Sequence, residues 1–161
     1  MKKMLIIISL LFSFTLFSAE VSGIVIKVID GDTITIQDGN DKFKVRFAHI
    51  DAPEKAQEYG KESAAALKEF IFNQHVYVEF HEIDMYGRII GTVYLTKLFG
   101  TYFDNVNMKM VSTGNAWWYE EYSKDANYLQ LQETAKLEKL GLWKADNPMP
   151  PWEFRKMNKN K

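Results

Sequence analysis

The sequence predicts an α+β fold that is mainly β: a five-stranded OB-type barrel with about three helices. Five runs rich in β-branched residues are separated by turn residues, and a helical run lies between the third and the fourth. Three strands, a helix and two strands is the order of an OB barrel. With 161 residues and 47% apolar content, the chain can bury the core of one domain.

The first three strands are predicted over residues 23–29, 33–37 and 43–47. β-Branched residues and the alternation of apolar with polar side chains indicate strands that bury one face. Asp30-Gly31 separates the first two runs, and residues 38–40, Asp-Gly-Asn, separate the next two. Both are typical hairpin turns, so we expect two consecutive hairpins.

A helix is predicted over residues 58–73, because its apolar side chains recur at helical spacing. Its buried face is expected to hold Ser63, Leu67, Phe70 and Ile71. Two further strands follow at residues 76–80 and 88–95, and then a turn at Phe99-Gly100.

A short helix is expected over residues 105–113, stopped by Gly114, and a last helix over residues 125–140, with Gly141 just past its end. From about residue 147, three prolines predict an extended tail that Trp152 and Phe154 pin back. We find no internal repeat and no second domain, so residues 20–161 are interpreted as a single domain.

The first 19 residues have the pattern of a secretory signal peptide. Two lysines precede a thirteen-residue uncharged run, 5–17, and the small residues Ser18 and Ala19 follow it. A transmembrane anchor is the alternative, but the run is shorter than the roughly 20 residues that cross a bilayer. We therefore favour cleavage and export to the periplasm or the medium. An uncleaved segment would instead predict a membrane-tethered structural protein.

Composition limits the classes of partner. The chain has no cysteine, which excludes a disulfide framework and a lipid-anchored cysteine. Without residues 1–19 the net charge is −3, whereas a tight nucleic-acid binder usually has a basic surplus. If the partner is a polyanion, the positive charge that attracts it must be confined to a small part of the surface. Such a protein is better suited to turning over a polyanion as a substrate than to storing it.

Three acidic residues, Asp32, Asp51 and Glu54, are candidates for a hard-cation site. Asp32 opens the second strand and Asp51 follows the third, and the start of one hairpin strand lies beside the end of its partner. Pro53 stiffens the turn and directs Glu54 toward the same space. Calcium accepts about six to eight oxygen ligands, so two aspartates, a backbone carbonyl and waters would satisfy it.

Arginine is rare here, with three arginines against seventeen lysines. Two of the three, Arg46 and Arg88, lie in or near these turns, where a planar, two-pronged clamp could meet the charge of a phosphoryl transition state. Arg46 precedes Asp51 by five residues, so strand alternation alone places them on opposite faces. The intervening turn must reorient one of them.

Each of these short sequence segments also has an ordinary structural explanation. Asp-Gly before Asp-Thr is common in hairpins, an arginine on a strand is usually solvated, and residues 84–88 form an ordinary glycine-containing turn. Their joint occurrence in this order favours metal-assisted attack on a phosphodiester.

At these residues the chain resembles the staphylococcal nuclease (thermonuclease) family. Residues 29–33 carry its Ile-Asp-Gly-Asp-Thr, residues 46–54 its Arg-x4-Asp-x-Pro-Glu and residues 84–88 its Asp-x-Tyr-Gly-Arg. The likeness covers about residues 22–155. It implies an OB barrel with three helices and a calcium-dependent endonuclease that cuts DNA and RNA and leaves 3′-phosphates.

The resemblance also implies roles by position. Asp32 and Asp51 would be calcium ligands, with the carbonyl oxygen of Ala52 as a third. Arg46 and Arg88 would hold the scissile phosphate. Glu54 would orient or deprotonate the attacking water.

Two tyrosines, Tyr86 and Tyr122, are candidates to contact the nucleotide by stacking or through the hydroxyl, because every base offers a π-face. The alternative is that they are core or rim aromatics. DNA and RNA are the expected substrates, Ca²⁺ the expected cofactor, and we expect a monomer without a stable protein partner.

Some positions depart from the family pattern. Met85, Glu120 and Glu121 stand where basic residues are common in the family, which should weaken polyanion binding. His49 replaces a frequent small residue. Its imidazole could be a ligand or a proton shuttle, but we favour a packed or solvated side chain.

A non-catalytic OB-fold module that binds nucleic acid is the main alternative. Such a module would not need Asp32, Asp51, Glu54 and both arginines together. It would also be expected to be basic.

Overall fold

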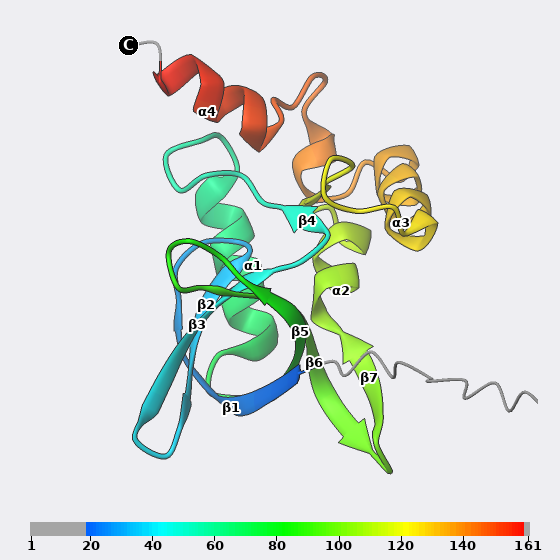
Figure 1. Ribbon diagram of the computed structural model, residues 1–161. Helices are drawn as coiled ribbons and strands as arrows, with labels where there is room; N and C mark the ends of the chain where they lie inside the picture. Colours follow the sequence, from blue (N-terminus) through cyan, green and yellow to red (C-terminus); the bar gives the residue numbers. More distant parts are fainter. Residues whose placement is uncertain (1–18, 160–161) are drawn as a thin grey trace, which may run out of the picture.

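The computed structural model describes residues 19–159, and six strands form its main sheet (Figure 1). These strands are β1 Ala19–Val28, β2 Thr33–Asp38, β3 Asp41–Phe47, β5 His75–Ile83, β6 Ile89–Leu98 and β7 Thr101–Asn105. Their order is β3-β2-β1-β5-β6-β7, and β3 also pairs with β6. The extra pairing is parallel and places Val45 opposite Ile89. Five strands therefore form a closed circuit, which confirms the predicted OB-like α+β fold.

The core lies inside this circuit. Every second residue of a strand points inward, so Ile34 and Ile36 of β2 are fully buried, as are Val76 and Val78 of β5. Helix α1, Gly60–Ile71, adds Leu67 and Ile71 to the same cluster. The helix face predicted from the sequence is therefore the buried one.

Within residues 19–159 there are four α-helices and one 3₁₀ helix, against about three helices predicted. After α1 come α2 Val106–Ser112, α3 Ala126–Leu137, the 3₁₀ helix η1 Gly141–Lys144 and α4 Pro151–Lys159. Asn105 and Asp125 cap α2 and α3, since each side chain accepts a hydrogen bond from a backbone N–H of the first turn.

The C-terminal segment corrects the prediction of an extended tail. Proline at the first helical position has its φ already set for a helix, and the Pro150 carbonyl accepts from the backbone N–H of Glu153 and Phe154, each at 3.1 Å. Residues after Pro150 therefore form α4. Its first turn is pinned as expected, because the Trp152 ring stacks on the Tyr119 ring at 5.3 Å between centroids.

Three short strands were also missed. β7 continues the antiparallel sheet from β6 through the Phe99-Gly100 turn, where the sequence predicted the turn alone. β4, Ile50–Asp51, pairs with β8, Trp117–Trp118, in a separate two-stranded sheet. Two-residue strands are too short to show a periodic pattern.

The predicted signal peptide, residues 1–19, lies outside the described residues apart from Ala19, the first residue of β1. Over residues 19–159, no helix combines the length and the apolar character needed to cross a membrane.

Candidate functional site

Asp32 is held in the tight turn between β1 and β2. The Asp32 N–H donates to Asp30 Oδ1 at 3.1 Å, and the Ile29 N–H donates to the Thr33 carbonyl at 2.8 Å. Gly31 allows this turn to press on α1, because a Cβ there would lie 1.9 Å from Ser63 Oγ. The Asp32 side chain is buried, and its Oδ2 accepts from the Ala52 N–H at 2.8 Å.

One residue with a positive φ, His49, explains how Arg46 and Asp51 come to lie on the same face. His49 has φ 69°, so the chain leaves β3 and turns before it enters β4. Alternation along β3 therefore does not extend to Asp51, whose strand pairs with Trp117 of β8. The turn returns the Asp51 carboxylate to the face on which Arg46 lies.

Arg46 joins the two aspartates directly. Its Nη1 lies 2.7 Å from Asp32 Oδ1 and its Nη2 lies 2.7 Å from Asp51 Oδ1. Asp51 is fully buried. Burial raises the pKa of Asp32 to about 7, although the Arg46 charge acts in the opposite direction. Burial would lower the pKa of the Arg46 guanidinium, but the charges of Asp32 and Asp51 outweigh it and raise that pKa.

Glu54 joins the same cluster through a residue that the sequence reasoning missed. Arg155 of α4 places Nη1 at 2.8 Å from Glu54 Oε1 and at 3.1 Å from Asp51 Oδ1, while its Nη2 lies 2.7 Å from Asp51 Oδ2. Burial opposes the Arg155 charge, but the hydrogen bonds to Asp51 and Glu54 raise the pKa of its guanidinium. The scarcity of arginine was the available signal, because Arg155 is the third of only three.

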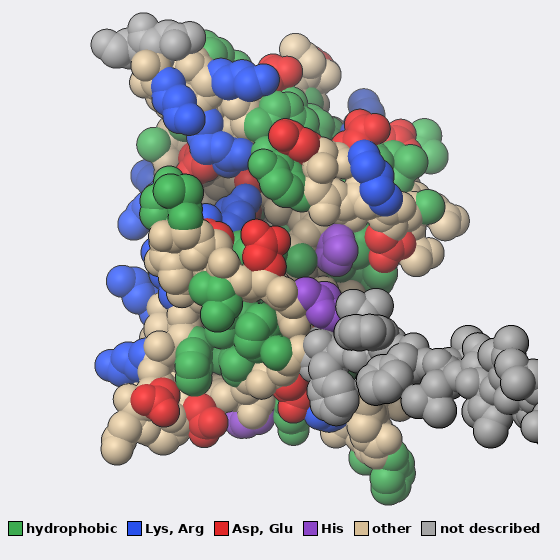
Figure 2. Space-filling view, viewed as in Figure 1, with side chains coloured by type: hydrophobic (Ala, Val, Ile, Leu, Met, Phe, Trp, Pro, Cys, Tyr) green, Lys and Arg blue, Asp and Glu red, His purple; other side chains and the backbone are tan. Residues whose placement is uncertain are grey.

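Figure 2 shows Lys and Arg side chains gathered on the face where α4 lies in Figure 1, with acidic side chains visible among them. The chain as a whole is slightly acidic. Positive charge that could attract a polyanion is therefore present on the face that carries α4.

The side-chain contacts of Arg88 are with Asp84 and not with this cluster. In the turn between β5 and β6, Arg88 Nε and Nη2 lie 2.7 and 2.6 Å from Asp84 Oδ2. Asp84 also accepts from the backbone N–H groups of Tyr86 and Arg88, each at 2.9 Å, and these hydrogen bonds lower its pKa although burial acts in the opposite direction. Asp84 therefore organises the turn that presents Arg88 and Tyr86.

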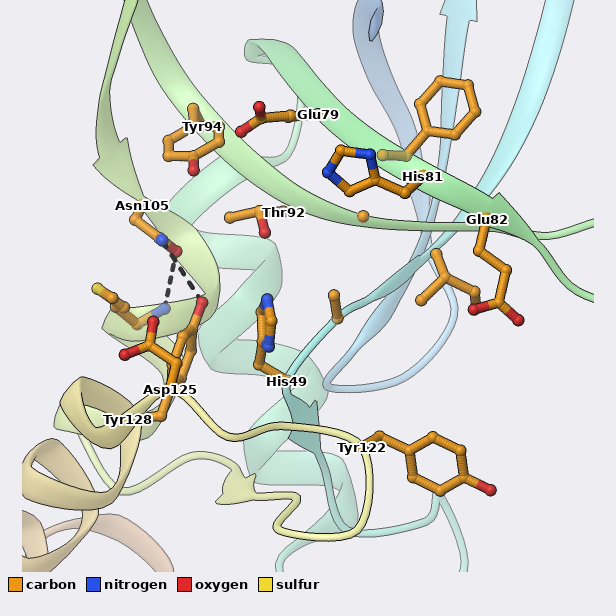
Figure 3. Close-up of a pocket in the computed structure, with 15 residues that line it drawn as sticks. His49, Glu79, His81, Glu82, Thr92, Tyr94, Asn105, Tyr122, Asp125 and Tyr128 are labelled. Atoms are coloured by element: carbon orange, nitrogen blue, oxygen red, sulfur yellow. Dashed lines mark hydrogen bonds between the residues drawn. The ribbon is translucent and has the colours of Figure 1, made fainter. Parts of the chain in front are cut away.

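Both predicted substrate-contacting tyrosines are exposed, which excludes the core alternative for them. Tyr86 is 76% exposed and Tyr122 is 70% exposed. Tyr122 lines a pocket of about 490 Å³, together with His49, His81 and Thr92 (Figure 3). Ile90, which also lines it, lies opposite Arg46 in the β3–β6 pairing. One wall of the pocket therefore lies on β6, the strand that pairs with β3 at Arg46.

His49 is packed, as the sequence analysis favoured. Its Nδ1 lies 3.0 Å from the buried Ser123 hydroxyl, and its ring lies 5.0 Å from the Tyr128 ring. Burial lowers the pKa of the imidazole, with the Asp125 charge acting in the opposite direction. Three departures from the family pattern, Met85, Glu120 and Glu121, are exposed.

No group of three or more Asp, Glu, His or Cys side chains among the described residues is arranged to hold a metal ion. Instead, guanidinium groups bridge the carboxylates of Asp32, Asp51 and Glu54. The donors still suit a hard cation, because two buried carboxylates converge and the backbone of Ala52 is held beside them. A cation at Asp51 Oδ1 would have to displace a guanidinium contact, because that oxygen already accepts from Arg46 and Arg155.

Comparison with known proteins agrees with this geometry. The model of the family described as "Staphylococcal nuclease homologue" matches residues 44–145. The chain belongs to the staphylococcal nuclease family. An "Uncharacterized endonuclease" of Escherichia coli is 39% identical over 155 residues, covering 96% of this chain and 98% of the relative. One of the same description from Haemophilus influenzae is 39% identical over 160 residues, covering 96% and 86%. A "Micrococcal nuclease" of Shigella flexneri is 37% identical over 147 residues, covering 88% and 84%.

The positive φ of His49 predicts that substitutions at this position differ in their effect on the free energy of unfolding. Asparagine tolerates positive φ, whereas a β-branched residue there is strained. We expect His49→Val to lose about 1 to 2 kcal/mol more unfolding free energy than His49→Asn, measured by urea denaturation. Equal losses in the two variants would show that the backbone at this turn is not the constraint.

Proposed function

We propose that the protein is an exported, calcium-dependent endonuclease that hydrolyses phosphodiester bonds of DNA and RNA without strong sequence preference and leaves 3′-phosphates. The observation that carries this proposal is the convergence of Asp32 and Asp51 on one guanidinium, with Glu54 beside them. Membership of a nuclease family and relatives named as endonucleases support it.

The metal in this proposal is held by Asp32, Asp51 and the carbonyl oxygen of Ala52. These are oxygen donors, the type that calcium prefers, and waters would complete the shell. When bound, the ion supplies positive charge to the phosphate and acidifies a water.

Arg46, Arg88 and Glu54 have separate roles in the proposed reaction. Arg46 and Arg88 have more N–H donors than their present contacts use, so each can also meet a non-bridging phosphate oxygen and stabilise the five-coordinate state. Arg155 contacts Glu54 at Oε1, so Oε2 is the oxygen that orients the attacking water and accepts its proton. The water oxygen bonds to phosphorus as the bond to the 5′ oxygen breaks, and that oxygen takes up a proton.

In this proposal the two exposed tyrosines contact the substrate without distinguishing one base from another. Tyr86 lies beside Arg88, whose guanidinium carbon is 5.6 Å from the ring centroid. Tyr122 borders the pocket that has one wall on β6, the strand that pairs with β3 at Arg46. Stacking on such rings tolerates any base, which fits a nuclease with little sequence preference.

Export is proposed from the N-terminal pattern of two lysines, an apolar run and small residues. Amino-terminal sequencing of the protein recovered from expressing cells should begin near residue 20. Recovery with Met1 or Lys2 still attached would contradict cleavage.

Metal dependence is tested with the purified protein, plasmid DNA and RNA. We expect degradation of both at about 1 to 10 mM calcium, arrest by chelator, and products with 3′-phosphate ends, because the proposed ligands are hard oxygens. End-group analysis and gel electrophoresis measure these outcomes. Binding of single-stranded DNA without cleavage under these conditions would instead indicate the non-catalytic OB module.

The geometry of Arg46 predicts a large effect from a substitution that keeps its charge. Arg46→Lys loses the fork that spans Asp32 and Asp51, and we expect turnover to fall about 100-fold or more, as when one preorganised donor is removed. Lys42→Gln, at the exposed far end of the same strand, is the matched control and should cleave like the wild type. Near wild-type turnover by Arg46→Lys would refute the clamp.

A further inference from the structure

Helix α4 is fixed to the protein at its first turn. Pro151 is buried, and the Trp152 ring packs on Tyr119 and, at 5.6 Å, edge-on to Trp117. Just before the helix, the Met149 carbonyl accepts from Gln57 Nε2 at 2.6 Å. Gln57 also accepts from the Glu54 N–H at 3.1 Å, so the segment that leads into α4 is tied to the loop that carries Glu54.

Beyond this first turn, Arg155 forms the side-chain hydrogen bonds and ion pairs that join α4 to the rest of residues 19–159. The residues that follow it, 156–159, are exposed. The second half of the helix is therefore held to the site mainly by the Arg155 guanidinium.

The oxygens of Asp51 are largely used by guanidinium groups. Oδ1 accepts from Arg46 Nη2 and Arg155 Nη1, and Oδ2 accepts from Arg155 Nη2. A carboxylate oxygen has two lone pairs, so Oδ1 has none left for a cation. Oδ2 keeps one lone pair, but a cation there would lie beside Arg155 Nη2, which donates to the same oxygen. A cation at Oδ1 must replace one of its two bonds, and Arg155, at 34% side-chain exposure, is more accessible than Arg46 at 20%.

The charges around Asp51 also indicate that Arg155 and a cation would compete. Three acidic side chains, Asp32, Asp51 and Glu54, face the two guanidinium groups of Arg46 and Arg155. Arg155 contacts both Asp51 and Glu54, so a cation bound at these two side chains would be repelled by its positive charge. Arg155 thus supplies to Asp51 and Glu54 the positive charge that a cation would otherwise supply.

We propose that Arg155 is a built-in competitor of the divalent cation, and that α4 is a latch over the site. In the metal-free protein Arg155 binds Asp51 and Glu54. When the cation binds, Arg155 releases Asp51, the second half of α4 loosens, and Glu54 becomes free to act on water. This inference rests on the proposed metal site. Arg155 lies outside residues 44–145, which the family model matches.

The test is calorimetric titration of calcium into the metal-free full-length protein. Arg155→Gln should bind calcium about tenfold more tightly or better, the factor expected if the open state of the wild type is populated to about a tenth. Arg155→Lys keeps the charge but loses the fork, and should be intermediate. Lys156→Gln removes a neighbouring exposed charge and should bind like the wild type.

A second measurement needs no variant. Hydrogen exchange of the wild type should become faster in residues 155–159 when calcium is added, while the amides of α1 stay protected. The metal-free Arg155→Gln protein should also melt at a lower temperature than the wild type and gain more from calcium, since Asp51 and Glu54 lose a counter-charge.

Two results would overturn the latch in different ways. Equal or weaker calcium binding by Arg155→Gln would show that Arg155 does not compete, and unchanged exchange in α4 would show that the helix does not loosen. Either result would leave the metal site standing. If neither the wild type nor Arg155→Gln binds calcium, the metal site itself is wrong, and the latch fails with it.

Discussion

The site depends on one shared guanidinium, that of Arg46, placed between two buried carboxylates. Taking charges out of water is costly, and a buried ion that loses its partner costs about 3 to 5 kcal/mol. Asp32 and Asp51 can therefore be buried close together only if a cationic group meets both. Three local features bring Arg46 and the two aspartates together. Gly31 brings the Asp32 turn onto α1, His49 reverses the chain after β3, and the β4–β8 pairing holds Asp51 in place.

The same requirement links the barrel to the C-terminal helix. Asp51 has more acceptor capacity than Arg46 alone uses, and Arg155 donates to both Asp51 oxygens and to Glu54. In the proposed reaction Asp51 also takes a metal, so its counter-charge in the resting protein has to be one that can leave. Arg46, on a barrel strand, is poorly suited to leave, whereas Arg155 is on a helix anchored at one end.

The sequence predicted what is local and periodic. Alternation located the strands of the barrel, helical spacing located Leu67 and Ile71 in the core, and the short strings located Asp32, Arg46, Asp51 and Glu54. It did not show how Arg46 and Asp51 face each other, because that depends on one left-handed residue, His49. It also missed Arg155, which lies 101 residues from Glu54 along the chain and is brought to it by the packing of the first turn of α4. Long-range pairs of this kind leave no local pattern, and here the scarcity of arginine was the one available sign.

Calcium binding by Asp51→Asn, followed calorimetrically beside the wild type, tests the central claim most directly. Asp51 is the one carboxylate that contacts both guanidinium groups. The account predicts that Asp51→Asn shows no calcium binding up to about 1 mM while circular dichroism shows that it remains folded, and that Asp38→Asn, at the exposed end of β2, binds like the wild type. Wild-type calcium affinity in folded Asp51→Asn would contradict it.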